Sequence, residues 1–176
     1  MSAAAVTIRR ATAGDAEELT RLHVRVWRAT YAGIAPASAV AALDEAHRLP
    51  GWRAALATPE AEGATLVAAA GGAIVGFVRY GPASQAELGP GGEVKYLYVD
   101  PDHARQGIGR RLMGAAFAAL KAAGFSGATL AVVRENAPAL RFYRALGGVQ
   151  TGRFTDAGPV WQSDNLVLHW PFGGAE

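Results

Sequence analysis

The 176-residue chain is long enough for one domain with a hydrophobic core and too short for two domains of ordinary size, so we expect one domain over residues 1–176. Its 17 Lys and Arg and 15 Asp and Glu give a net charge of +2, and the arginines are scattered, which argues against a nucleic-acid partner. The absence of cysteine excludes disulfides, thiolate metal sites and a covalent cysteine intermediate.

The N-terminal segment MSAAAVTIRR has neither a basic leader nor the apolar stretch of a signal peptide, and no run reaches the ~18 apolar residues needed to span a bilayer. We therefore expect a cytoplasmic protein without a membrane partner. Residues 6–11 predict a short strand, and residues 14–29 predict a helix with apolar residues at helical spacing. Two further helices are expected over 36–47 and 50–57, each beginning at a proline.

From residue 64 the apolar period changes to that of strands. Residues 64–70 and 73–80 predict a hairpin, because the two glycines between them supply the positive φ that tight turns need. Residues 81–92 are rich in Gly, Pro and polar residues and predict a loop. A third strand is expected over 93–99.

Residues 107–123 are rich in alanine and predict a helix that ends at Gly124, followed by a strand over 128–133. Strands 93–99 and 128–133 with this helix between them form a β-α-β unit, so we expect them to be parallel in an otherwise antiparallel sheet. The remaining expected elements are a helix over 136–146 with Asn136 as N-cap, and strands over 149–154 and 165–170.

The segment YLYVDPDHARQGIGRRLM combines a strand, a turn with two glycines and the start of a helix. Glycines let an anion approach free backbone N–H groups, and the positive end of the helix dipole faces that anion. A phosphate or pyrophosphate is therefore the expected ligand. Arg110 and Arg111 in the first helical turn fit such a ligand, or are two solvated surface arginines. The turn lacks the third glycine of a dinucleotide fingerprint.

Taken in order, the segments IRRAT, GFVRY, EVKYLYVDP, HARQGIGRRL and VVRENAPALRFYRALGG resemble the GNAT superfamily of N-acetyltransferases over most of the chain. The resemblance implies an α/β (α+β) fold, with a mixed, mostly antiparallel sheet whose central parallel strand pair is splayed and flanked by helices. It also implies acetyl-CoA as acyl donor and direct transfer, in a ternary complex, to a primary amine of a small molecule, a peptide or a protein. Ala104 departs from the Arg or Gln that leads the family's phosphate turn.

The resemblance also assigns site residues. Glu93 stands where the family has its general base, and strand alternation places it on the face of Lys95 and Leu97. The alternative is a carboxylate at the start of the strand that is solvated or paired with Lys95. Tyr143 is the candidate acid for the departing thiolate, or a core tyrosine. The expected cofactor-binding residues are Leu97, Tyr98, Val99, Arg105, Gln106, Gly107, Ile108, Gly109, Arg110, Asn136 and Tyr143.

Several points stay open at this stage. A regulatory or sensor domain that binds acyl-CoA without catalysis, or a structural partner with a vestigial site, are the alternatives to an enzyme. Trp27, Tyr31 and Trp161 either line an acceptor pocket or belong to the core. The four histidines have no metal-like spacing, so we expect no metal. A strand near the C-terminus would allow a homodimer. The sequence does not name the acceptor.

Overall fold

The computed structural model describes residues 5–173, and their strands form one seven-stranded sheet in the order β1-β2-β3-β4-β5-β7-β6. All neighbouring strands are antiparallel except β4 and β5, which confirms the expected mixed sheet with a central parallel pair. The strands are β1 (Thr7–Arg10), β2 (Ala64–Ala70), β3 (Ala73–Pro82), β4 (Gly92–Val99), β5 (Gly127–Val133), β6 (Val149–Asp156) and β7 (Ser163–Pro171).

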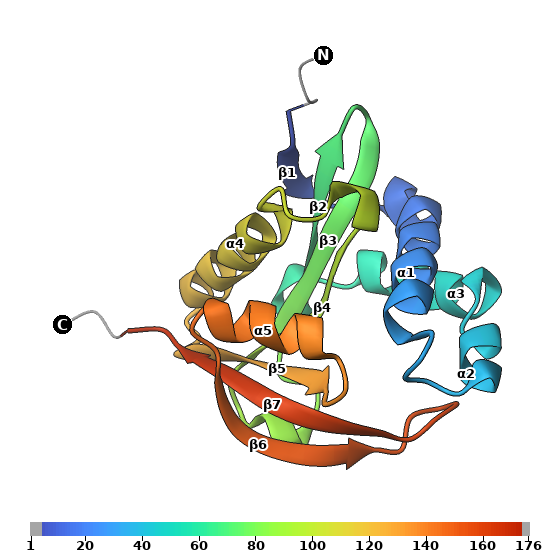
Figure 1. Cartoon of the computed structure of the whole chain (residues 1–176). Helices are drawn as coiled ribbons and strands as arrows, with labels where there is room; N and C mark the ends of the chain where they lie inside the picture. The colour runs from blue at the N-terminus through green and yellow to red at the C-terminus, as the bar shows by residue number, and fades with distance from the viewer. Residues whose placement is uncertain (1–4, 174–176) are drawn as a thin grey trace.

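Helices cover both faces of the sheet (Figure 1). On one face, α4 and α5 pack over the main apolar cluster, which includes Leu112, Leu120 and Leu140. On the other face, α1 and α3 enclose a second cluster around Trp52 and Phe77. The helices are α1 (Ala16–Tyr31), α2 (Ala37–Ala42), α3 (Glu45–Ala57), α4 (Ile108–Ala122) and α5 (Ala137–Ala145).

The boundary between α2 and α3 differs from the expected one. The helix expected over 36–47 ends at Ala42, and α3 then begins at Glu45 and continues through Pro50. Asp44 starts this new helix, because its carboxylate accepts a hydrogen bond from the backbone N–H of His47 at 2.8 Å. Pro50 lies inside the helix, so the cap at Asp44 and not the proline sets the break.

A β-bulge interrupts the pairing of β3 with β4. Arg79 is opposite Tyr96, whereas Tyr80 is opposite Val94, so Lys95 is an extra residue on β4. Every side chain of β4 after the bulge therefore points to the face opposite the one that simple alternation predicts.

The bulge corrects the expected orientation of Glu93. Val94 packs in the cluster under α4, so its neighbour Glu93 faces the side of α1. After the bulge, Leu97 packs against the α4 cluster and Tyr98 packs on the α1 side. The expectation that Glu93 and Leu97 share a face was wrong, because a bulge at Lys95 shifts the alternation by one residue.

Candidate functional site

Strands β4 and β5 diverge soon after they begin. Gly92 pairs with Ala128 and Glu93 with Thr129, and no further pairing between the two strands is present in the described part of the chain. The strand edges beyond these pairs leave backbone groups available to an extended ligand that lies like an added strand. A pocket of about 510 Å³, here called the splay pocket, opens between them and is lined by Tyr31, Leu97, Tyr98, Val99, Asn136 and Tyr143 among others.

A second pocket of about 400 Å³, here called the turn pocket, lies between the turn that precedes α4 and the helix α5. It shares Leu97, Val99, Ala139 and Tyr143 with the splay pocket, so the two adjoin. Its other residues include His103, Arg105, Gly107, Ile108, Gly109 and Arg110.

The backbone of the turn leaves N–H groups without partners. Arg105 has a φ of 62° and Gly107, the N-cap of α4, has a φ of 75°. These left-handed conformations turn successive amides toward the same side, as in anion-binding nests. The N–H groups of Gly107 to Arg110 have no hydrogen-bond acceptor within residues 5–173, and Arg111 is the first to donate, to Gly107. The arrangement suits a phosphate group.

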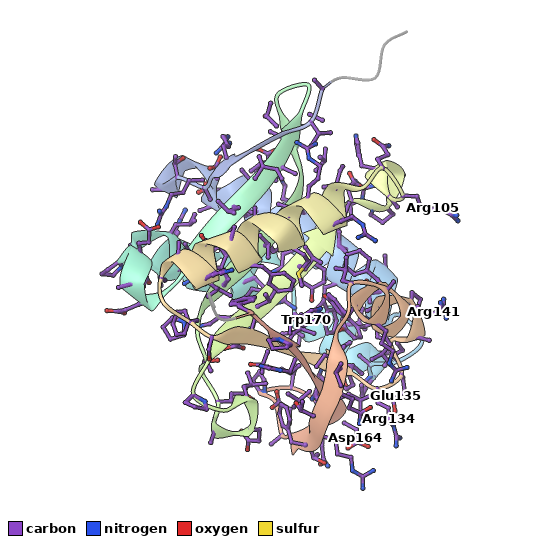
Figure 2. The ribbon with its side chains drawn as sticks, turned by 90° about the vertical axis from the view of Figure 1, so that its left-hand side faces the viewer. Arg105, Arg134, Glu135, Arg141, Asp164 and Trp170 are labelled. Atoms are coloured by element: carbon purple, nitrogen blue, oxygen red, sulfur yellow. The ribbon has the colours of Figure 1, made fainter. Side chains whose placement is uncertain are left out.

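Side chains around the turn divide into two groups. Ile108 is buried in the core, and a Cβ on Gly109 would lie 3.2 Å from the Phe142 ring, so Gly109 allows α4 to approach α5 closely. Gln106 is exposed and does not line the turn pocket, and Arg105 projects outward from the turn (Figure 2). The expected cofactor residues thus meet at one place mainly through their backbones.

The two neighbouring arginines at the start of α4 make different contacts. Arg110 lines the turn pocket, whereas Arg111 donates to the backbone oxygen of Val6 at 3.0 Å and holds the N-terminal segment. Sequence reasoning could not separate the two, because they are neighbours in the chain and differ only in direction on the helix.

Arg25 of α1 anchors the turn from the opposite face, and sequence reasoning missed it. Its guanidinium donates to Asp100 at 3.0 Å and to Asp102 at 2.8 Å. Asp100 also caps the short 3-10 helix over Pro101–His103, accepting from the N–H of Asp102 at 3.1 Å. The turn is therefore tied to α1 as well as to β4.

Asn136 and Tyr143 reach the splay pocket from the two ends of α5. Asn136 is the N-cap of α5, as expected, and its Oδ1 accepts from the N–H of Ala139 at 3.3 Å. Burial raises the pKa of Tyr31, and the nearby side chain of Asn136 partly offsets this effect. Burial, with a smaller effect of Tyr31, raises the pKa of Tyr143, so its hydroxyl stays protonated at neutral pH.

Glu93 is buried at the base of the splayed strands. Its carboxylate accepts from the hydroxyl of Ser84 at 2.7 Å and from the N–H of Ser84 at 2.8 Å. Glu93 does not line the splay pocket or the turn pocket. The ion pairs of the described residues do not include Glu93 with Lys95, which was one of the alternatives to the role of base, and the hydrogen bonds to the Glu93 carboxylate come from Ser84.

A third pocket of about 270 Å³ lies on the α1 side of the sheet and is here called the His23 pocket. It shares Lys95 and Tyr96 with the splay pocket. Its remaining residues are His23 from α1, Arg79 from β3, and His47, Arg48, Gly51, Trp52 and Ala55 from α3. No pattern in the sequence indicates this grouping, because its members come from segments that are far apart in the chain.

The three expected aromatic residues pack together in one cluster, but only Tyr31 lines the splay pocket. The ring centroid of Tyr31 lies 4.9 Å from that of the buried Trp27 and 6.1 Å from that of Trp161, which lines another pocket near Glu135. One of the three therefore contacts the site. In residues 5–173 no cluster of three or more potential metal ligands is present, and no helix there is long and apolar enough to cross a membrane.

Comparison with known proteins gives consistent matches. The chain is 29% identical over 140 residues to the uncharacterized N-acetyltransferase YuaI of Bacillus subtilis, and the aligned region covers 80% of this chain and 78% of YuaI. The fold matches the PaiA N-acetyltransferase of Thermoplasma acidophilum, solved with coenzyme A, at a TM-score of 0.74 and 21% identity, over 96% of this chain and 99% of that one.

The fold also matches yncA of Salmonella typhimurium, solved with acetyl-CoA, at a TM-score of 0.70 and 20% identity, over 98% of this chain and 96% of that one. Residues 20–147, well over half of the chain, match the acetyltransferase (GNAT) family. The resemblance seen in the sequence is confirmed: the chain belongs to the acetyltransferase (GNAT) family and is an acyltransferase.

Proposed function

We propose that the protein transfers an acetyl group from acetyl-CoA to a primary amine of a small molecule or a peptide, directly and within a ternary complex. The observation that carries this proposal is the junction of the turn pocket with the splay pocket at Tyr143. A ligand whose phosphates lie on the free amides of the turn would extend along β4 with its thioester beside Tyr143. PaiA and yncA, which share the fold, were solved with coenzyme A and acetyl-CoA.

In this proposal the backbone N–H groups from Arg105 to Arg110 hold the pyrophosphate, and Arg110 adds charge. Each hydrogen bond to a charged group contributes ~1.5 to 3 kcal/mol. Leu97, Tyr98 and Val99 offer backbone groups to the pantetheine arm, and Asn136 faces the same arm from α5. Backbone donors do not depend on the side chain at Ala104, so the departure from the family's turn is tolerated.

The acceptor amine must lose a proton before it attacks. An alkylammonium with a pKa of ~10 is only about 0.1% neutral at pH 7, which makes a base or a water path to one necessary. Glu93 is the proposed base. Its carboxylate does not line either cofactor pocket, so the proton reaches it through water, and the hydrogen bonds from Ser84 fix its orientation.

The amine nitrogen then forms a bond to the thioester carbon, and the carbon–sulfur bond breaks. Backbone N–H groups of β4 near Leu97 to Val99 polarise the carbonyl. Tyr143 gives its proton to the leaving sulfur, and the phenolate recovers one from solvent or the amine. The raised pKa of Tyr143 keeps the hydroxyl protonated before the reaction, which this role requires.

The proposal is tested by thermal unfolding and by a transfer assay. Acetyl-CoA at 100 times its Kd should add ~2.7 kcal/mol to stability, with dephospho-CoA and ADP as controls. Release of free CoA thiol over a panel of amines then reports transfer. Stabilisation by acetyl-CoA without transfer to any amine would favour the sensor alternative. The cytoplasmic location and a homodimer formed through the edge strand β6 stay predictions.

A further inference from the structure

Three basic side chains meet in the His23 pocket. Arg48 comes from α3, Arg79 from β3 and Lys95 from the bulge of β4, and no Asp or Glu is among the residues that line the pocket. Arg79 is 8% exposed and donates only to uncharged oxygens, the hydroxyl of Thr65 at 3.1 Å and the carbonyl of Ala55 at 3.4 Å. The pocket wall is therefore strongly positive.

These cations have no anionic partner in the described part of the chain. Arg9, Arg10, Arg25, Arg53 and Arg134 all lie within 4.0 Å of a carboxylate. The set of ion pairs contains none of the three basic residues of the pocket. Two enclosed guanidinium groups without a counter-charge are costly, since buried charges are normally paired.

The surroundings of Arg48 and Arg79 also lack a negative charge that would offset their burial. Burial lowers the pKa of Arg48 and of Arg79, and the nearby groups that oppose this effect are tyrosines and not carboxylates. Arg48 lies with its guanidinium carbon 5.4 Å from the centre of the Trp27 ring, and its buried Nε has no hydrogen-bond partner. An anion in the pocket would supply the missing partner.

His23 adds a neutral donor to the same pocket. Its Nδ1 accepts from Trp52 at 3.2 Å, so the proton of the neutral ring lies on Nε2, which is buried and has no partner. Nε2 can donate to an oxygen of a ligand. A cationic ligand would find neither an acceptor there nor a carboxylate on the wall.

We propose that the His23 pocket binds an anionic group, a carboxylate or a phosphate, of the amine that is acetylated. This inference rests on the proposed function. Arg48, Arg79 and Lys95 hold the anion, and the amine of the same molecule reaches past Tyr96 into the splay pocket. The two pockets share Lys95 and Tyr96, so one small molecule can occupy both. The acceptor is thus an amino acid or an amino phosphate, and not a polyamine.

Charge-matched acceptors provide the test. The full chain is assayed for thiol release with L-amino acids, with the carboxamide of each, with 2-aminoethyl phosphate and with spermidine. Each kcat/KM is expressed per neutral amine, because a carboxamide lowers the pKa of its amine. Anionic acceptors should be preferred about 10- to 100-fold, since hydrogen bonds to charged groups contribute this much. The phosphate arm shows which of the two anions is favoured.

Variants of Arg48 test whether the His23 pocket causes this preference for anionic acceptors. Arg48→Gln should reduce the preference for acids over carboxamides to near unity and leave stabilisation by acetyl-CoA unchanged, whereas Arg48→Lys should retain part of it. Arg53→Gln is the matched control, because Arg53 lies on the same helix but pairs with Glu17 at the surface. It should behave as the wild type.

The outcomes separate this inference from the proposed function. Equal turnover of acids and carboxamides, or a preference for spermidine, would overturn the anionic acceptor and leave the acetyltransferase intact. Stabilisation by acetyl-CoA with no acetylation of any anionic amine would also overturn it. An absence of stabilisation by acetyl-CoA would contradict the proposed function, and this inference with it.

Discussion

Trp52 donates its indole N–H to Nδ1 of His23 across 3.2 Å, and this bond fixes the tautomer of a histidine that is 3% exposed. Burial, assisted by the charge of Arg48, lowers the pKa of His23 to about 3. The ring is therefore neutral at pH 7. The hydrogen bond joins α1 to α3 beside the His23 pocket. Because the buried ring is neutral, the free energy of unfolding should depend on pH.

The first prediction concerns acid stability. The unfolded chain protonates His23 at a pKa of ~6.5, whereas the native ring resists protonation down to about pH 3, so stability falls as the pH drops through this window. At pH 5 the loss should be about 2 kcal/mol relative to pH 7.5. Urea unfolding at both pH values measures it. His23→Gln should remove this part of the pH dependence, and the exposed-residue variant His47→Gln should not; equal slopes for the two variants would contradict the assignment.

The second prediction compares two glycines of the α4 region. Gly107→Ala places a side chain at a φ of 75° and should cost about 1 kcal/mol of stability and weaken acetyl-CoA binding, because the amides of the turn shift. Gly114 lies in the interior of α4, and a Cβ there would meet no other atom within 4 Å, so Gly114→Ala should add ~0.5 to 1 kcal/mol to the free energy of unfolding. Denaturant unfolding and calorimetric titration report both. Undisturbed acetyl-CoA affinity in Gly107→Ala would argue against the turn as the phosphate site.

The third prediction tests Tyr143 as the proton donor. Tyr143→Phe removes a single hydroxyl from the junction of the splay pocket and the turn pocket, so kcat should fall about 10²-fold while the Kd of acetyl-CoA stays nearly constant. Steady-state kinetics and titration separate the two effects. Tyr80→Phe, which changes a buried tyrosine of the α4 cluster outside both pockets, serves as the control. If both variants turn over at the wild-type rate, Tyr143 is a core residue.

The fourth prediction concerns Glu93. Glu93→Gln keeps the shape of the side chain and removes the base, so kcat should fall by about 10²-fold or more across pH 6 to 9. Ser84→Ala removes one of the two hydrogen bonds that orient the carboxylate and should produce a smaller loss. Initial rates with a good acceptor measure both. Full activity of Glu93→Gln would show that another group or water alone accepts the proton.

Local patterns in the sequence predicted much of the fold. Hydrophobic periodicity located the strands around the hairpin and the helix α4, because each pattern depends on neighbours within a few residues. The turn from Arg105 to Arg110 was recognised for the same reason, since the two glycines and the start of a helix lie together in the chain. Asn136 was identified as the cap of α5, which the structure bears out.

Errors arose where a distant partner decides the conformation. The bulge at Lys95 comes from pairing of β4 with β3 and has no signature in the β4 sequence, so the orientation of Glu93 was wrong. The break between α2 and α3 was assigned to Pro50, although the cap at Asp44 decides it. The hydrogen bonds from Ser84 to the Glu93 carboxylate also could not be predicted, because they form only when the loop before β4 is folded.

The sequence by itself determined the family, the order of the elements and the glycine-rich turn before α4, because these depend on residues that are adjacent in the chain. Only the tertiary structure decided the His23 pocket. Its residues from α1, α3, β3 and β4 meet because both helices pack on one face of the sheet, and neither spacing nor composition encodes that meeting. The charge that this pocket presents to an acceptor is a property of the folded chain.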